Sequence, residues 1–130
     1  MGNKLNNEGI RTLSEFIKVN LSLQMLDLGR NMFGDAGFKF FAQEMGAACK
    51  LSYLDISKNK DLSDEGSLTI LAQQLAHNKY LQTLDLSGLS IRKPFLKQYF
   101  EPSLKKNCTL KFVVGNITPD IIDLDLRVNI

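Results

Sequence analysis

Apolar residues recur along the chain in a fixed phrase. Leu51, Leu54 and Ile56 follow the spacing L-x-x-L-x-L, and Asn59 stands three positions later. The phrase also begins at residue 23 and at residue 81, where Leu89 replaces the asparagine. Apolar residues at alternate positions predict a short strand with one buried face. Three copies, 28 and 30 residues apart, indicate a repeat protein.

Between the phrases the apolar spacing changes to three and four residues. This spacing predicts one amphipathic helix in each repeat. In the first repeat the apolar positions are Phe38, Phe41, Ala42 and Met45, and in the second they are Leu68, Leu71, Ala72 and Leu75. Phe33, Phe38 and Phe41 are expected in the core, and Phe40 alone is expected to be exposed.

Two polar residues in the first repeat have predicted structural roles. Asn31 is expected to turn its amide inward and to satisfy backbone groups where the chain leaves the strand. Asp35 precedes the predicted helix and is expected to cap its first turn. In the third repeat, Pro102 is expected to break or kink a helix.

We expect a single domain over residues 1–130. It consists of a partial repeat at 1–22, repeats at 23–50, 51–80 and 81–109, and a C-terminal cap at 110–130. The partial repeat has an asparagine but no strand phrase before it. Its first core layer is therefore expected to lie uncovered, as in a piece of a longer protein or a chain covered by something else.

The C-terminal cap departs from the repeat. Residues 110–114 are strand-like, and Ile121–Asn129 matches the strand phrase again after only eleven residues. That distance leaves no room for a helix. A hairpin-like closing strand or a short repeat without a helix is expected, and it would cover the last sheet edge.

The period, the residues around the asparagine and the L-A-x-x-L of the helix resemble the ribonuclease-inhibitor-like class of leucine-rich repeats. This class includes nucleotide-sensing innate receptors, the Ran GTPase-activating protein, tropomodulins and CARMIL actin regulators. The resemblance implies an α/β fold, a right-handed solenoid with parallel concave strands and convex helices. It also implies protein binding on the concave face, and it transfers no catalytic residue.

Residues between the core leucines are expected to face solvent on the concave side. Across the strands they form rows of equivalent positions, among them a row of aspartates that Asp125 could extend. We predict that a protein partner binds this face. The predicted partner-binding residues are Met25, Asp27, Arg30, Tyr53, Asp55, Lys58, Thr83 and Asp85.

The aspartate row has two interpretations. It could hold a basic segment or a metal ion, or aspartate could be the usual residue here, solvated or neutralised by Arg30 and Lys58. We favour the second, because like charges about 4.8 Å apart repel weakly in water. Neither histidine nor cysteine supports a metal site. Tyr53 is an aromatic residue among charges, which is typical of an interface hot spot, although packing along its neighbours would also explain it.

Charge is uneven along the chain, although the formal net charge is only +2. Residues 92–111 form a basic region, in which Glu101 is the single acidic residue. It could meet an acidic protein, an anionic membrane or RNA, but such dilute charge is more typical of a solvated face. No nucleic-acid partner is therefore expected. The basic residues of the cap are Arg92, Lys93, Lys97, Lys105, Lys106 and Lys111.

Cys49 and Cys108 occupy equivalent repeat positions, too far apart for a disulfide. Both are expected as small buried hydrophobic residues in a reducing, cytoplasmic compartment. No apolar run approaches the length of a membrane helix, so no membrane insertion is expected.

Catalysis has no support in the sequence. His77 is the single histidine, and neither a phosphate-binding loop nor a nucleophile elbow is present. We predict a non-enzymatic scaffold or binding module without cofactor or metal. Two alternatives stay open. One is a structural subunit that docks, or self-associates, through its uncovered N-terminal layer; the other is a GTPase regulator.

Overall fold

The strand phrases that begin at residues 23, 51 and 81 each form a short strand in the computed structural model, and a further strand follows at Phe112–Val114. The strands are β1 (Met25–Asp27), β2 (Tyr53–Asp55), β3 (Thr83–Asp85) and β4 (Phe112–Val114). They pair in parallel in the order β1-β2-β3-β4. The register places equivalent repeat positions side by side, so that Asp27, Asp55, Asp85 and Val114 share one row.

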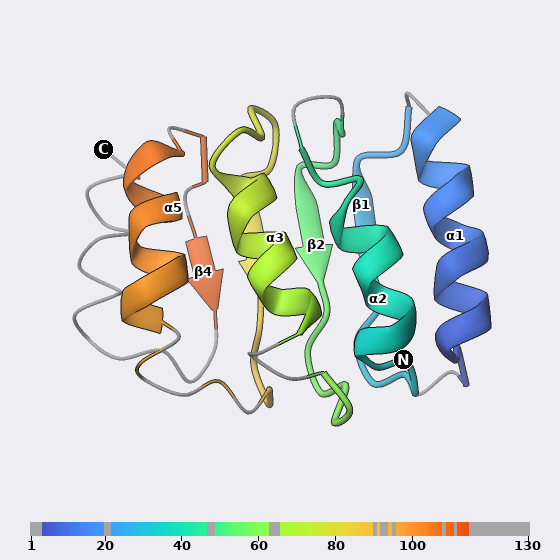
Figure 1. Ribbon diagram of the computed structural model, residues 1–130. Helices are drawn as coiled ribbons and strands as arrows, with labels where there is room; N and C mark the ends of the chain where they lie inside the picture. Colours follow the sequence, from blue (N-terminus) through green and yellow to red (C-terminus); the bar gives the residue numbers. More distant parts are fainter. Residues whose placement is uncertain are drawn as a thin grey trace.

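Helices cover one face of this open sheet (Figure 1). They are α1 (Asn7–Val19), α2 (Asp35–Ala42), α3 (Ser67–Leu75) and α5 (Glu101–Lys106), and a π-helical segment spans Leu96–Phe100. Neighbouring helices contact one another in chain order. All of the described helices lie on this same face of the sheet in Figure 1.

The structure describes residues 4–19, 22–46, 49–62, 66–89, 91, 94, 96–107, 109–110 and 112–114. For residues 96–97, 101, 104–105 and 112–114 the description covers the backbone alone.

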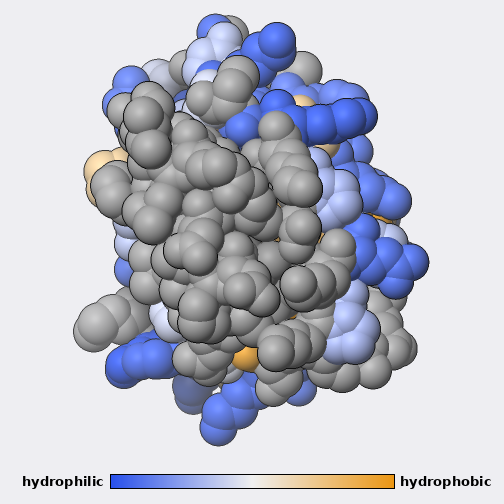
Figure 2. Space-filling view, turned by 90° about the vertical axis from the view of Figure 1, so that its left-hand side faces the viewer, coloured by the Kyte–Doolittle hydropathy of each residue, from blue (hydrophilic) through white to orange (hydrophobic). Residues whose placement is uncertain are grey.

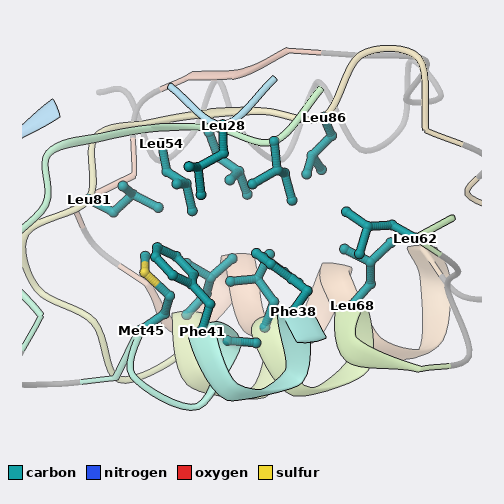
Figure 3. Packing of buried hydrophobic residues seen from close by; sticks show 14 of the residues in the cluster. Leu28, Phe38, Phe41, Met45, Leu54, Leu62, Leu68, Leu81 and Leu86 are labelled. Carbon is teal, nitrogen blue, oxygen red and sulfur yellow. The ribbon is translucent and has the colours of Figure 1, made fainter. Parts of the chain in front are cut away.

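The core lies between the sheet and the helices. Leu54 and Leu84 point from the middle of their strands and are completely buried, as are Phe38, Phe41 and Met45 on the helix side. Figure 3 shows the two sets meeting from opposite layers. The rings of Phe33 and Phe38 stack on each other, with centroids 5.6 Å apart. The predicted apolar positions of both helices are confirmed as core, and Phe40 is half-buried rather than exposed.

Buried asparagines join the repeats where the chain leaves the sheet. The Nδ2 amide of Asn31 donates to the carbonyls of Leu28 and Gly29, at 3.0 and 3.2 Å, and its Oδ1 accepts the backbone N–H of Leu5. The inward role predicted for Asn31 is therefore confirmed.

A second set of asparagines performs the same task at the opposite ends of the strands. The amide of Asn78 donates to the carbonyl oxygens of Met45, Gly46 and Cys49, and Asn107 donates to Leu75 and Asn78. Because these amides replace water for buried carbonyls, they fasten each repeat to the one before it.

Asp35 does not cap its own helix, which was the sequence prediction. The N-cap of α2 is Gly34, and it makes no side-chain capping bond. Asp35 Oδ1 instead accepts from the backbone N–H and the hydroxyl of Ser67, the first residue of α3, at 3.1 and 2.7 Å. In the same way, Asn7 Oδ1 accepts the backbone N–H groups of Gly34 and Gly37. In both cases the first residue of one helix caps the start of the next helix.

The C-terminal part of the described chain continues the sheet. The strand expected at 110–114 is present as β4, parallel to β3. Pro102 lies in the first turn of α5, and the π-helical segment Leu96–Phe100 runs directly into that helix, so the helix type changes next to the proline. Asp125 and the expected strand at Ile121–Asn129 lie outside the described residues.

The N-terminal layer is less well covered than the layers after it. Leu26 of β1 is half-buried, whereas the equivalent Leu54 and Leu84 are completely buried. Phe16 and Val19 of α1 are 48% and 77% exposed. The uncovered first layer predicted from the repeat pattern is present in the described chain.

Cys49 is buried, and its Sγ lies 3.7 Å from the sulfur of Met45. Burial is the main reason that the pKa of this thiol is raised, and Glu44 adds to it, while a backbone hydrogen bond at Leu51 acts in the opposite direction. Cys49 is thus the small buried hydrophobe that was predicted, and Cys108 lies outside the described residues.

Candidate functional site

The face of the sheet that points away from the helices carries the predicted partner-binding residues. Alternation along each strand turns Met25 and Asp27 outward, and it does the same for the equivalent residues of β2 and β3. Met25 is 65% exposed, whereas Tyr53 and Thr83 beside it are half-buried. We call this surface the sheet face. The register of the strands brings together Met25, Tyr53 and Thr83 in one row and Asp27, Asp55 and Asp85 in the next.

The aspartates have a structural task that the sequence analysis missed. Asp27 Oδ1 accepts the backbone N–H of Gly29 at 2.9 Å, and Asp55 does the same for Ser57 at 2.8 Å. Asp85 accepts the N–H of Ser87 at 2.9 Å and also its hydroxyl. Each carboxylate therefore closes the turn that follows its strand, which explains the repetition of aspartate without any partner.

These turn bonds use Oδ1 of each aspartate, and all three aspartates line a depression at the surface. The sequence predicts that this row is either solvated or neutralised by Arg30 and Lys58. Among the described residues, the ion pairs within 4 Å are those of Lys18 with Glu15 and Glu44, on the helix side. Neutralisation of the aspartates by direct ion pairs is therefore absent from the described part of the chain.

Tyr53 lies in the row next to the aspartates, and its surroundings raise the pKa of its phenol. Partial burial is the largest cause of a raised pKa of its phenol, and the negative charges of Asp55, Asp85 and Asp27 follow in that order. An aromatic ring with a polar tip beside carboxylates suits a protein interface.

Small residues form the floor beyond the aspartate row. Strand alternation would also turn the next row, Gly29, Ser57 and Ser87, toward solvent, but Gly29 and Ser57 are buried and Ser87 is half-buried. A Cβ at Gly29 would approach Ser57 Oγ to 2.9 Å, so the neighbouring turns pack closely here. A depression of about 300 Å³ lies over this floor, between the aspartates and the cations Arg30 and Lys58.

Arg30 and Lys58 occupy an unusual backbone conformation. Their φ angles are 57° and 58°, in the left-handed region, and Gly88 holds the equivalent place with φ of 76°. A side chain in this region costs about 1–2 kcal/mol relative to an ordinary conformation. The backbone N–H of Arg30 donates to the carbonyl oxygen of Ser57 at 2.8 Å, and that of Lys58 donates to the carbonyl oxygen of Ser87 at 2.9 Å. These bonds continue the ladder of the sheet beyond the strands.

The predicted basic cap can be placed only in small part. Lys106 is exposed at the end of α5. Arg92, Lys93 and Lys111 lie outside the described residues, and the side chains of Lys97 and Lys105 are also outside the description. The described residues on this side of the molecule are mainly hydrophilic at the surface (Figure 2).

Among the described residues, no group of three or more histidine, cysteine, aspartate or glutamate side chains is arranged to hold a metal ion. Within the same residues, no helix has both the length and the apolar character that crossing a membrane requires. His77 is exposed, beyond the end of α3.

Comparison with known proteins agrees with this architecture. The family model described as "Leucine Rich repeat" matches residues 47–71. The solved structure of leiomodin-1 actin-binding site 2 superimposes with a TM-score of 0.83 at 16% identity, covering 98% of this chain and 77% of that one. The tropomodulin C-terminal domain from Caenorhabditis elegans gives a TM-score of 0.58 at 8% identity, covering 95% and 90%. No curated protein matches the sequence.

These likenesses concern the fold, because both identities are low. The matched family model, the parallel ladder and the asparagine network all describe the same repeat. The chain therefore has a leucine-rich-repeat fold with an open parallel sheet covered by helices on one face, consistent with the ribonuclease-inhibitor-like class.

Proposed function

We propose that this chain is a non-enzymatic protein-binding module whose sheet face holds the partner. The observation that carries the proposal is Tyr53, a half-buried aromatic residue in the middle of the face and beside three carboxylates. Aromatic residues at the centre of a surface, surrounded by polar groups, supply most of the binding energy in many interfaces. Met25, exposed in the same row, adds apolar area.

Actin is the first partner to test. The structural neighbour leiomodin-1 is described by its actin-binding site 2, and its fold matches nearly the whole of this chain. The low identity means that a shared fold supports the choice without transferring any contact residue. A cytoskeletal setting follows as part of the same proposal.

Co-sedimentation with actin filaments tests the proposal. The sheet-face variant combines Tyr53→Ala with Asp55→Asn, because the asparagine oxygen can still accept from Ser57 while the charge is lost. The control combines Phe40→Ala with Lys39→Gln, which also removes one half-buried aromatic ring and one charge, but on the helix side. We expect at least about tenfold weaker binding for the sheet-face variant alone.

Equal weakening of both variants, or of the control alone, would move the interface away from the sheet face. If wild-type protein does not bind actin, the same three proteins are used for capture from a cell lysate. A protein retained by wild type and control but lost from the sheet-face variant is then the partner.

The uncovered N-terminal layer supports a second candidate function, docking in a larger assembly. Leu26 is half-buried while its counterparts in later repeats are buried, and Phe16 and Val19 are exposed nearby on the neighbouring helix. Stacking of another layer here would bury apolar surface, at roughly 25 cal/mol per Å². Sedimentation equilibrium tests it: self-association that disappears on Phe16→Ser with Val19→Ser supports stacking, and a monomer at all concentrations contradicts self-stacking.

A further inference from the structure

We infer that a groove beside the sheet face receives an acidic peptide segment of the partner. The groove has a volume of about 520 Å³ and lies where the chain has left the strands. We call it the cation groove. Its lining comprises Arg30, Asn31, Met32, Lys58, Lys60, Asp61 and Gly88. The inference rests on the proposed protein-binding function and specifies the chemistry of the partner.

The charge of the groove is strongly one-sided. Among the described residues of the lining, Arg30, Lys58 and Lys60 are exposed cations and Asp61 is the single carboxylate. Among the described residues, no carboxylate lies within 4 Å of these three cations, since the ion pairs found there involve Lys18. Complementary charge from a partner would therefore replace water rather than an existing ion pair.

The backbone of two of these cations has an energetically unfavourable conformation. Arg30 and Lys58 have positive φ angles, where glycine would be less strained, as at Gly88. Strained residues of this kind point to a role of the side chain. Gly88 also gives room to Lys58: a Cβ at residue 88 would approach Lys58 Cγ to 2.8 Å, so the stem of the lysine lies over the glycine.

The shape favours a peptide over a phosphate group. Arg30 and Lys58 stand on successive turns whose backbone hydrogen bonds continue the sheet ladder, so a ligand that contacts both side chains runs across the strands. Met32 is 59% exposed and adds an apolar surface to the same groove. An extended acidic segment with one apolar side chain would satisfy both features.

The neighbouring aspartate row restricts how such a segment can lie. Arg30 and Lys58 line both the cation groove and the depression over Asp27, Asp55 and Asp85. Carboxylates of the partner are attracted on one side of this pair of cations and repelled on the other. The arrangement therefore selects the register of the partner, since like charges act against the wrong alignment.

The test uses a fluorescein-labelled peptide, Gly-Glu-Glu-Leu-Glu-Glu-Gly, and fluorescence anisotropy with the full chain. The groove variant combines Arg30→Gly with Lys58→Gly, which removes both cations and relieves the positive φ angles, so folding is expected to be preserved or improved. The control, Lys39→Gln with Lys79→Gln, loses the same net charge from exposed positions outside the groove.

We expect wild type and control to bind the acidic peptide and the groove variant to bind about tenfold more weakly. Binding by wild type should also weaken as salt is raised, because the cations are exposed. A peptide in which lysine replaces every glutamate should not bind. Absence of binding to wild type, equal binding by the groove variant, or an equal loss in the control would each overturn the inference.

Inositol hexaphosphate, and vesicles of equal parts phosphatidylcholine and phosphatidylserine, distinguish the other anionic ligands. Binding of either one through Arg30 and Lys58 without binding of the peptide would also overturn the inference. The sheet-face variant separates it from the proposed function. If a partner is lost from that variant but kept by the groove variant, the proposed function stands and the acidic-segment inference is wrong.

Discussion

Asn59 Oδ1 accepts the backbone N–H of Asn31 at 3.0 Å, although 28 residues separate them in the chain. The amide of Asn59 also donates back across the repeat boundary to the carbonyl of Leu28, at 2.9 Å. One buried side chain therefore connects two turns of the solenoid in both directions. This bonding explains why the asparagine follows the strand phrase at a fixed distance.

Replacing Asn59 by alanine should destabilise the fold by about 3 kcal/mol. Asn59 is completely buried, and its loss leaves the N–H of Asn31 and the carbonyl of Ile56 without their partner. Each buried polar group left unsatisfied costs about 1–3 kcal/mol. Urea unfolding measures the effect as a lower midpoint. Asn6→Ala is the control, because Asn6 is exposed and serves one N–H only. Equal losses for the two variants would contradict the network.

Asp35 should stabilise α3 rather than the helix on which it lies. Its Oδ1 accepts two hydrogen bonds from Ser67. Asp35→Ala is expected to cost about 1 kcal/mol, the usual value of a helix cap, and Asp35→Asn less, since the amide oxygen can still accept. Hydrogen exchange locates the effect. Faster exchange at the first turn of α3 is expected, and a change confined to α2 would contradict the assignment.

Gly37 should tolerate no side chain. A Cβ there would lie 2.6 Å from the Cα and carbonyl oxygen of Asn7 and from Cγ2 of Ile10, so α1 and α2 would have to separate. Overpacking of this kind costs about 1–3 kcal/mol.

Thermal unfolding of Gly37→Ala measures this cost, with Gly46→Ala as the control. At Gly46 a Cβ meets the far end of the flexible Gln74 side chain, which can move away. We expect a clear drop in the melting temperature for Gly37→Ala and little change for the control. Indistinguishable melting temperatures would show that the helices are not in close contact.

Tyr53 should titrate at a higher pH than a free tyrosine. Partial burial and then the charges of Asp55, Asp85 and Asp27 raise the pKa of its phenol. Because the folded-state pKa exceeds the unfolded value of about 10, the contribution of this group to stability is complete below pH ~10. It is lost as the pH rises through the folded pKa.

Phenolate absorbance measures the titration, as the difference between wild type and Tyr53→Phe. The midpoint is expected above pH ~10, and Asp55→Asn should lower it by removing one of the charges. A midpoint at or below that of free tyrosine would show that the ring does not lie among the aspartates. Tyrosines elsewhere in the chain cancel in the difference.

The repeat pattern was sufficient for the core and for the order of the strands. Leu54, Phe38 and Leu68 are buried as their spacing predicted, because one apolar position in every turn or strand must face the other layer. The inward asparagine also followed from its place after the strand. These features depend on residues within a single repeat, and a single repeat is what the pattern describes.

Features that depend on contacts between repeats were harder to predict. Asp35 caps the following helix, a contact over 32 residues that no local motif signals. Asn78 and Asn107 form the second asparagine set, but in the sequence they appear only as polar residues before a strand. Their 29-residue spacing was the available signal, since equivalent asparagines in neighbouring repeats can bond to each other.

The sequence predicted which strand residues face outward at the candidate site, but not which turn residues are buried or which loops line the groove. Alternation along the strands correctly turned Asp27, Tyr53 and Asp55 outward. It could not show that Gly29 and Ser57 are buried, because turns beyond a strand do not keep its period. Nor could it bring Met32 and Lys60 beside Arg30, which requires the folded path of two successive loops.

The central claim is that the sheet face binds a protein partner, and photo-cross-linking tests it most directly. A benzophenone amino acid replaces Tyr53 in one protein and Phe16, on the helix side, in another. Both are irradiated in the same cell lysate or with actin filaments. The account predicts one predominant cross-linked protein from position 53, absent from position 16. The same product from position 16 alone, or none from position 53 while the partner still binds, would contradict it.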